Sequence, residues 1–309
     1  MTHVHPKLLP LLEAARGQPG LADVSVEQAR TQIVARTAAR ARGPAVADVR
    51  EVQAEGSDGV LIPIRLYIPW RPCGLAVAFH GGGWLMGSRD SFDATCRHLA
   101  VESGLAIANV EYRLAPEHPF PAAIDDAFAA TAWLAAQGSS FGLPASKLVV
   151  LGESAGGNLA AVTCLLARER GGPEIRLQVL VYPAVDARQE CESLRTFETG
   201  YLQTTRDVAY AYKTYGVGQR VAASDWRVSP LLAQSHAGLP PALIISAECD
   251  GTRDDSDAYA HALLEAGVPA VHVRYGGMLH TFFGMRGLVE EAAEAQRQVA
   301  AAMRAAVAN

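Results

Sequence analysis

The sequence predicts an α/β protein built around one mostly parallel sheet. Half of the 309 residues are hydrophobic, which is enough for one large core. From about residue 75 onward, short apolar runs rich in β-branched residues alternate with longer segments of helical periodicity. Alternation of this kind is typical of parallel strands joined by helical crossovers, so we expect a sheet flanked by helices.

The first 45 residues lie ahead of the predicted sheet and are helical in pattern. Ser25 and Gln28 have the spacing of a capping box, in which the two residues satisfy each other's backbone N–H groups. This spacing predicts a helix that opens at Ser25 and runs through Arg42. The Gly43-Pro44 pair that follows is a strong signal for the end of a helix.

Eight strands are predicted, the first two antiparallel and the rest connected by right-handed crossovers. Gly56 and Gly59 mark a hairpin turn between the first two. The predicted strands are Val49–Glu55, Val60–Ile68, Leu75–Phe79, Leu105–Glu111, Lys147–Gly152, Arg176–Tyr182, Ala242–Ala247 and Ala270–Tyr275. The helices predicted among them are Pro121–Gln137, Ala155–Arg168, Asp255–Ala266 and Val289–Ala305. Between residues 187 and 229 the alternation stops, which indicates an insertion after the sixth strand.

Composition and charge argue against several classes of protein. The formal net charge of -5 is spread along the chain, so we expect no nucleic-acid or membrane-surface partner. The five cysteines are scattered without a C-x-x-C pair, which argues against a disulfide framework or a zinc site. Residues 1–10 lack the apolar core of a signal peptide, and no apolar run is long enough to span a bilayer. We therefore expect a soluble, reduced, cytoplasmic protein.

A short motif after the fifth strand carries the first candidate for chemistry. Residues 152–156, Gly-Glu-Ser-Ala-Gly, have the pattern G-x-S-x-G between a strand and a helix, which is the context of a nucleophile elbow. Such a tight turn holds its serine at strained dihedral angles and requires small neighbours. The free N–H groups of the new helix point to the same place as the serine hydroxyl. Ser154 is therefore a candidate nucleophile, although a glycine-rich turn with an incidental serine has the same pattern.

A second motif, His80-Gly-Gly-Gly-Trp84, follows the third strand directly. Three consecutive glycines cost backbone entropy, so a functional reason is expected for them. A backbone without side chains lets two N–H groups approach a substrate oxygen closely. This loop is where the second half of an oxyanion hole is placed in folds with a nucleophile elbow. The alternative is a flexible loop that happens to contain a glycine run.

An acid and a base follow at the ends of the last two predicted strands. Asp250 ends the seventh strand region, and His280 comes just after the eighth. Ligands of open α/β sheets bind at the carboxyl ends of strands, and both residues are expected there. In a Ser-His-Asp triad, His280 would take the proton of Ser154 and deliver it to the leaving alcohol. Asp250 would hold the imidazole tautomer and stabilise its cation.

Other residues of the same types have simpler interpretations. Asp254 and Asp255 compete with Asp250, but both are placed to open the next helix, where a carboxylate meets free N–H groups. Glu248 is either a structural acid or a residue that tunes the site. The remaining histidines fall in the N-terminal tail, on helices, in loops or in mid-strand: His3, His5, His98, His118, His236, His261 and His272.

Taken together, these motifs resemble the hormone-sensitive lipase-like carboxylesterases, a bacterial esterase branch (family IV) of the α/β-hydrolase superfamily. The resemblance runs from about residue 45 to the C-terminus. The matching segments are HGGGW at 80–84, YRLAPEHPFPAA at 112–123, GESAGGNLA at 152–160, DWRVSPLL at 225–232, AECD…RDD at 247–255 and the Gly-x-x-His-x-Phe run around His280.

The resemblance implies a fold, a division of the chain and an activity. It implies an α/β-hydrolase fold with a small helical cap, made of N-terminal cap helices at 1–45 and a cap insertion at 187–229. The catalytic domain would then comprise residues 46–186 and 230–309. It also implies a serine carboxylesterase that hydrolyses short- to medium-chain acyl esters through an acyl-enzyme, without a cofactor. A small-molecule ester would be the substrate, and a homodimer could form through the eighth strand.

By the same resemblance, the oxyanion hole consists of backbone N–H groups of Gly82, Gly83 and Ala155. The sequence departs from the family in two places. Glu153 stands where the family usually has Asp or Thr, and Gly251-Thr252 stands where it often has Pro-Leu.

Two other functions remain possible on this sequence. Plant gibberellin receptors resemble the same family without its triad histidine, so a non-catalytic small-molecule receptor is one alternative. The other is an amidase that uses the same triad. The cap predicts a bounded apolar pocket, and four aromatic residues are candidates for its walls, namely Trp84, Tyr201, Phe282 and Phe283.

Overall fold

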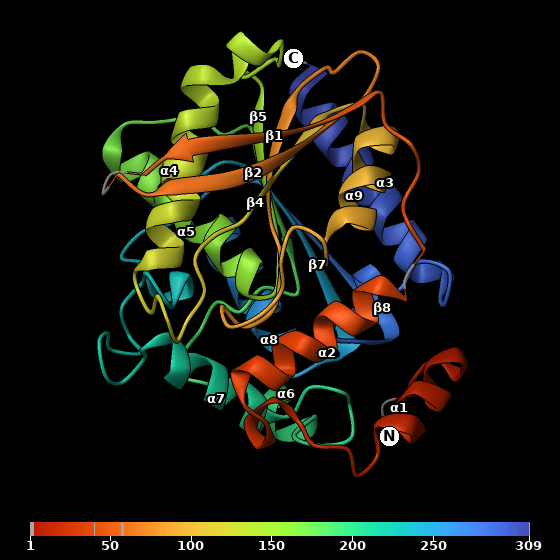
Figure 1. The fold of residues 1–309 in the computed structure, drawn as a ribbon. Helices are drawn as coiled ribbons and strands as arrows, with labels where there is room; N and C mark the ends of the chain where they lie inside the picture. The colour runs from red at the N-terminus through yellow and green to blue at the C-terminus, as the bar shows by residue number, and fades with distance from the viewer. Residues whose placement is uncertain (1–2, 40, 57–58, 309) are drawn as a thin grey trace.

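A computed structural model describes residues 3–39, 41–56 and 59–308 of the chain (Figure 1). These residues form an eight-stranded sheet with the strand order β1-β2-β4-β3-β5-β6-β7-β8. The strands are β1 Asp48–Glu55, β2 Leu61–Ile68, β3 Leu75–Phe79, β4 Ala106–Val110, β5 Leu148–Glu153, β6 Leu177–Val181, β7 Ala242–Cys249 and β8 Ala270–Leu279.

The predicted sheet is confirmed, with two differences of detail. β1 pairs antiparallel with β2, as expected, but β2 also pairs antiparallel with β4. Within the described sheet, β2 is therefore the strand that runs against its neighbours, and β1 runs in the common direction. β7 and β8 also extend further than predicted, to Cys249 and Leu279, and so end directly before Asp250 and His280. Two residues of the predicted hairpin turn, 57 and 58, lie outside the described residues.

The central strands are apolar on both faces because helices cover both. In β3, Leu75, Val77 and Phe79 pack into one hydrophobic cluster, while Ala76 and Ala78 pack into the other. Alternate side chains of a pleated strand point to opposite faces of the sheet. Because both faces are buried here, apolar residues occupy both sets of positions. Figure 1 shows α4 and α5 on one side of the sheet and α3 and α9 on the other.

The helices agree with the predicted pattern where capping or length made it strong. The capping box of α2 is present, with Gln28 N donating to Ser25 Oγ over 3.1 Å and Ser25 N donating to Gln28 Oε1 over 3.0 Å. The helix ends at Ala38, however, and not at Arg42 as predicted. The α-helices of the described chain are α1 Leu9–Ala15, α2 Val26–Ala38, α3 Asp93–Ser103, α4 Ala122–Gln137, α5 Ala155–Arg170, α6 Glu192–Thr196, α7 Thr205–Tyr215, α8 Arg253–Glu265 and α9 Glu290–Ala308.

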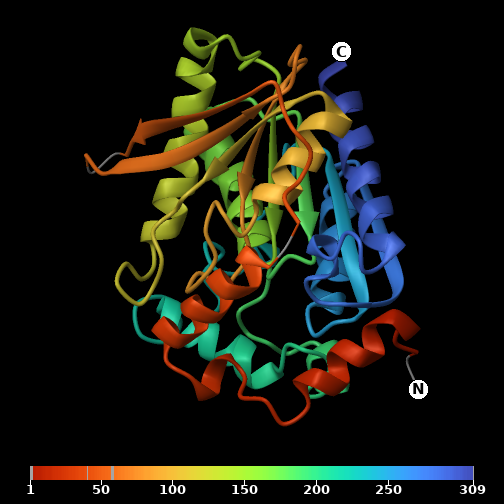
Figure 2. The same cartoon turned by 45° about the vertical axis from the view of Figure 1, so that its right-hand side comes forward.

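The N-terminal helices and the insertion after β6 meet over one end of the sheet. Figure 2 shows α1 and α2 beside α6 and α7, below the arrowheads of the central strands. The backbone N–H of Ala22 donates to Asp207 Oδ1 in α7 over 2.9 Å. Arg30 of α2 reaches the segments that follow β3 and β4, because its guanidinium donates to the carbonyls of Leu85 and Ala115 over 2.7 and 2.9 Å. Two segments far apart in sequence thus cover the carboxyl ends of the parallel strands.

Across the described residues, no helix combines the length and the apolar character needed to cross a membrane. The five cysteines are free thiols.

Candidate active site

The G-x-S-x-G motif forms a sharp turn between β5 and α5. Ser154 has φ 56° and ψ -116°, a combination that costs a non-glycine residue about 1–3 kcal/mol. Its N–H donates to the carbonyl of Val181 over 2.9 Å, which fixes the turn to the end of β6. Ser154 is the N-cap of α5, so the free N–H groups of the first helical turn lie next to its side chain.

The glycines around Ser154 are required by close backbone approach. A Cβ at Gly152 would lie 1.9 Å from the carbonyl oxygen of Gly156, and one at Gly156 would lie 2.1 Å from that of Phe79. A Cβ at Gly157 would lie 2.8 Å from Pro183. No real side chain tolerates such distances. The small residues that the motif predicts are therefore needed to let α5 start directly against the end of β3.

Three side chains from three strand ends meet at this turn. His280 Nε2 lies 3.0 Å from Ser154 Oγ, and His280 Nδ1 lies 2.7 Å from Asp250 Oδ2. The second carboxylate oxygen of Asp250 accepts the N–H of Thr252 over 2.9 Å. The exposed fractions are 9% for Ser154, 3% for His280 and 1% for Asp250. The structure therefore brings together the serine, histidine and aspartate that the sequence singled out, with the histidine between the other two.

The surroundings of His280 favour its protonated form. Burial lowers the pKa of His280, but the charge and hydrogen bond of Asp250 and the charge of Glu153 raise it by more, so this pKa lies above its usual value. The ring of Tyr182, at the end of β6, packs on the imidazole with its centroid 4.7 Å away. An imidazole in this environment can accept a proton and hold it as a stabilised cation.

The two competing aspartates point elsewhere. Asp254 Oδ2 accepts the N–H of Ser193 in α6 over 2.7 Å, and Asp254 Oδ1 accepts from Arg253. Asp255 is buried, and this burial together with the charge of Asp186 raises the pKa of Asp255 to about 7. Both lie in the first turn of α8, as predicted. Among the described residues, Asp250 is the carboxylate that contacts the imidazole of His280.

The glycine loop after β3 lies beside the serine. A Cβ at Gly81 would lie 3.5 Å from the Cβ of Ser154. Gly82 and Gly83 have φ 126° and 61°, in the left-handed region that favours glycine. A Cβ at Gly82 would also lie 2.0 Å from the carbonyl oxygen of Met86. The loop therefore needs its glycines both for conformation and for space.

Aromatic side chains hold both ends of this loop. His80 is stacked on Tyr112 with ring centroids 4.3 Å apart, and the Tyr112 hydroxyl donates to the His80 carbonyl over 2.7 Å. Trp84 is stacked on Tyr215 of α7 at 4.6 Å. The indole of Trp84 is 1% exposed, so this residue anchors the loop to the insertion instead of lining an open pocket wall. Phe282 and Phe283, also expected as wall residues, are fully buried in the core.

A second serine, histidine and aspartate lie close together elsewhere in the chain, but the serine is not on a turn and is not accessible. Ser246 Oγ lies 2.7 Å from His272 Nε2, and His272 Nδ1 lies 3.1 Å from Asp257. Ser246 is fully buried within the regular strand β7, with no turn and no adjacent helix start. Its hydroxyl is therefore out of reach of a substrate. The mid-strand interpretation of His272 is consistent with this arrangement.

Two residues near the site were missed or left open by sequence reasoning. Tyr182 packs on His280, and its position as the last residue of the predicted sixth strand was the available signal. Glu248 Oε2 accepts the N–H of Gly277 over 2.6 Å, three residues before His280. Glu248 thus contacts the segment that carries the histidine and does not point at the serine.

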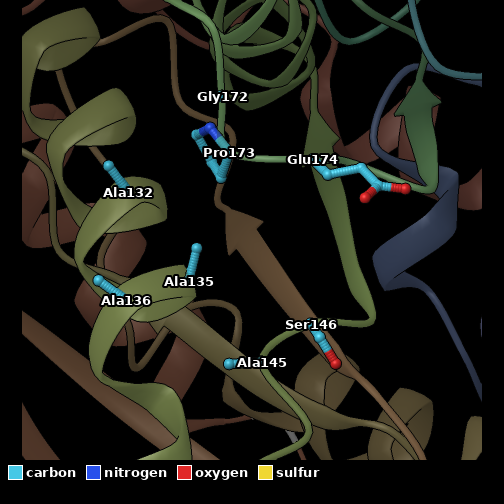
Figure 3. A pocket seen from close by; sticks show the side chains of 8 residues that line it. All are labelled: Ala132, Ala135, Ala136, Ala145, Ser146, Gly172, Pro173 and Glu174. Carbon is cyan, nitrogen blue, oxygen red and sulfur yellow. The ribbon is translucent and has the colours of Figure 1, made fainter.

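An open pocket of about 470 Å³ lies at the opposite end of the central strands from Ser154 (Figure 3). Ala145 and Ser146, ahead of β5, and Gly172 and Pro173, ahead of β6, are among its lining residues. These residues sit at the amino ends of the parallel strands. The pocket is therefore remote from the cluster around Ser154 and has no part in its chemistry.

Comparisons with known proteins agree with this geometry. A protein family described as having the alpha/beta hydrolase fold matches residues 76–284. The chain is 41% identical over 275 residues to the carboxylic ester hydrolase LipN of Mycobacterium tuberculosis, an alignment that covers 85% of this chain and 72% of the relative. It is 39% identical to the ethyl acetate hydrolase of Pseudomonas putida, over 77% of this chain and 76% of the relative.

A solved structure superimposes on nearly the whole chain. It is an ester hydrolase from the metagenome of Lake Arreo, complexed with a derivative of bipyridine phosphonate. The TM-score is 0.92 at 36% sequence identity, and the alignment covers 98% of both chains.

Proposed function

This chain belongs to the hormone-sensitive lipase-like family of α/β-hydrolases and is a carboxylic ester hydrolase, and we propose that it cleaves short- to medium-chain acyl esters through a covalent acyl-serine. The proposal assigns the nucleophile to Ser154, the general base and acid to His280, and the orienting carboxylate to Asp250. It needs no cofactor, and its substrate is a small-molecule ester.

The proposed reaction has two halves. In the first, Ser154 Oγ attacks the ester carbonyl carbon while His280 Nε2 accepts the hydroxyl proton. The tetrahedral intermediate then loses its alkoxy group, and His280 gives the proton to the departing alcohol oxygen. In the second half, His280 removes a proton from water, whose oxygen attacks the acyl carbon. The carboxylic acid leaves, and the proton returns to Ser154.

Charge develops on the carbonyl oxygen in both halves. We assign its stabilisation to the backbone N–H groups of Gly82, Gly83 and Ala155. The Ala155 N–H belongs to the free first turn of α5, and the glycine loop lies against the elbow. Preorganised donors of this kind typically contribute about 3–4 kcal/mol each to the lowering of the barrier.

One observation carries the proposal, namely that His280 bridges Ser154 and Asp250 at 3.0 and 2.7 Å. A non-catalytic receptor of this fold would have no use for such a relay. The test is rapid mixing with an activated p-nitrophenyl ester, in which formation of the acyl-serine releases a burst of nitrophenolate equal to the enzyme concentration. A receptor gives no burst. Comparison of an ester with its matching amide tests the amidase alternative, which predicts similar rates for the two.

We also propose that residues 1–45 and 187–229 act together as a cap over a catalytic domain of residues 46–186 and 230–309. The contacts between Ala22 and Asp207, and between Arg30 and Leu85, support this division. A cap that closes a small pocket fits short acyl chains. A curated relative is named for ethyl acetate, an ester of this size.

Two further parts of the proposal concern assembly and compartment. β8 pairs with β7 on one side in the described sheet, and Val271 on β8 is 58% exposed, so we propose a homodimer formed through this edge. Light scattering of the Val271→Arg variant should then show a shift from dimer to monomer.

We place the protein in the cytoplasm, a location with which five free thiols are compatible, and cell fractionation tests that placement.

A further inference from the structure

The pairing of β7 with β8 contains an irregular bulge beside the proposed acid and base. Ala247 pairs with Tyr275, and Cys249 pairs with Leu279, so Glu248 alone stands opposite residues 276–278. A bulge of this kind leaves backbone N–H and C=O groups without partners in the ladder. Asp250 follows β7 directly, and His280 follows β8 directly. The geometry of the bulge therefore sets the offset between the two residues.

Gly277, in the middle of the bulge, is held from two sides. Its N–H donates to Glu248 Oε2 over 2.6 Å, and its carbonyl accepts the N–H of His5 over 2.9 Å. Gly277 has φ 69°, and a Cβ there would lie 2.9 Å from the His3 carbonyl oxygen and 2.9 Å from the His5 nitrogen. Only glycine allows the N-terminal residues to come this close.

Residues 3–8, here called the N-terminal strap, are fixed in place by side chains as well. Val4 and Leu8 are 8% and 0% exposed, in the hydrophobic cluster that also contains Met278. The imidazole of His5 lies 3.5 Å from Glu291 in α9. The strap, which the sequence analysis placed in an N-terminal tail ahead of the sheet, is thus part of the packed structure next to His280.

We propose that Glu248 and the N-terminal strap form a clamp on this bulge, with Glu248 as a positioning residue that keeps His280 in register with Asp250. The inference rests on the function proposed above. A misplacement of about 1 Å in a catalytic group can cost on the order of a hundredfold in rate. An irregular strand end with unpaired backbone groups would shift by that much without the two hydrogen bonds to Gly277.

The clamp has a signature that a general loss of stability lacks. In the described part of the chain, the groups that act on the imidazole of His280 besides Ser154 are Asp250 after β7, Glu153 at the end of β5 and the Tyr182 ring directly after β6. If the bulge loosens, the contact with Asp250 lengthens while the other two remain. The pKa of His280 then falls, and the acidic limb of the kcat/KM profile moves to lower pH.

The experiment compares four variants of the full chain on a soluble p-nitrophenyl ester from pH 5 to 9. Glu248→Ala removes the acceptor for Gly277, whereas Glu248→Gln keeps an oxygen that can accept the same N–H. Gly277→Ala pushes the strap away without deleting it. Glu265→Ala, an exposed change in α8, is the matched control. Circular dichroism and thermal melting of each variant establish that it is folded.

We expect Glu248→Ala and Gly277→Ala to lose about ten- to hundredfold in kcat with little change in KM, and to shift the acidic limb downward. Glu248→Gln should keep most of the activity and the original limb. If folded Glu248→Ala retains the rate and profile of the parent, the clamp is refuted. A loss of rate with an unmoved limb, or without recovery in Glu248→Gln, also refutes it. Ser154→Ala, measured in parallel, separates the two proposals, because an active Ser154→Ala enzyme overturns the proposed function itself.

Discussion

The backbone N–H of Ser193 donates a hydrogen bond to Asp254 Oδ2 over 2.7 Å, and the Ser193 hydroxyl donates to the carbonyl of Gly251 over 2.6 Å. Asp250, the proposed acid, comes directly before the segment that these two contacts hold. Ser193 belongs to α6, so the insertion after β6 holds the loop that follows β7. That loop begins with Gly251-Thr252, and the hydroxyl of Ser193 ties the Gly251 carbonyl to α6.

This arrangement predicts different costs for two aspartate substitutions. Asp250→Asn should lower kcat roughly ten-thousandfold, because an amide in contact with His280 Nδ1 favours the wrong imidazole tautomer. Asp254→Asn should cost far less, since an amide oxygen can still accept the N–H of Ser193. Steady-state kinetics of both purified variants provide the check. If Asp254→Asn is the more damaging change, the acid has been misassigned.

A second prediction concerns the charge of Glu153. This carboxylate helps to raise the pKa of His280, which must be neutral to accept the proton of Ser154. The kcat/KM of the parent enzyme should therefore fall as pH decreases through that pKa. Glu153→Gln removes a negative charge, lowers the pKa of the imidazole and should move the acidic limb to lower pH.

Glu153→Asp is the control for that change. It keeps the charge, so the limb should stay near that of the parent and the activity within about tenfold, equivalent to 1.4 kcal/mol of barrier. A loss near that of Ser154→Ala would instead reveal a direct catalytic role for Glu153.

A third prediction links pH to stability through Asp255. The pKa of this carboxyl is raised to about 7 in the folded state by burial and by Asp186, against a usual value near 3.8. The folded protein therefore binds more protons than the unfolded chain between these two values. The contribution to stability is fully present below about pH 4 and is lost as pH rises toward about 7, by up to roughly 4 kcal/mol.

Asp255→Asn should flatten that dependence. Urea unfolding at several pH values measures it, with Glu265→Gln, an exposed carboxyl of α8, as the matched control. Equal slopes for the parent and Asp255→Asn between pH 4 and 7 would contradict the assignment.

The cap leads to a prediction on acyl chain length. Each methylene that enters an apolar pocket contributes about 0.8 kcal/mol, or roughly a fourfold gain in kcat/KM, until the pocket is full. We expect a maximum at short to medium chains, a fall for long chains and no jump in rate at the micelle boundary. A series of p-nitrophenyl esters measures this. Preference for long-chain triacylglycerol emulsions with interfacial activation would identify a true lipase instead.

The hydrogen bonds that hold α2 against the segments after β3 and β4 can be tested in the same series. Arg30 donates to the carbonyls of Leu85 and Ala115 and pairs with Glu117, so Arg30→Gln should loosen α2 and flatten the chain-length profile. Arg16→Gln, which removes an exposed arginine paired with Glu13, is the matched control and should leave the profile unchanged.

Much of the fold was predictable because its signals are local. The G-x-S-x-G turn, the HGGG loop and the buried apolar strands depend on short-range sterics and on period-two burial. The capping box at Ser25 likewise placed the start of α2. The end of α2 was mispredicted because the Gly43-Pro44 pair marks only the last position that a helix can reach. The helix itself ends earlier, at Ala38.

The residues missed by sequence reasoning depend on contacts between distant segments. Nothing local to Glu248 reveals that its carboxylate meets Gly277, or that His5 binds the same residue from the other side. The extension of β8 past Tyr275 was hidden by two glycines, which read as the end of a strand. In the structure they form a bulge, and the strand continues to Leu279.

The central claim is that Ser154 is the nucleophile, and covalent labelling tests it most directly. A fluorophosphonate should modify the parent enzyme with one-to-one stoichiometry, and peptide mass spectrometry should place the adduct on Ser154. Ser154→Ala should take no label and lose about a million-fold in kcat. Ser246→Ala, which disrupts the buried contact with His272, should still be labelled and active. An adduct on any other residue, or an active Ser154→Ala enzyme, would contradict the account.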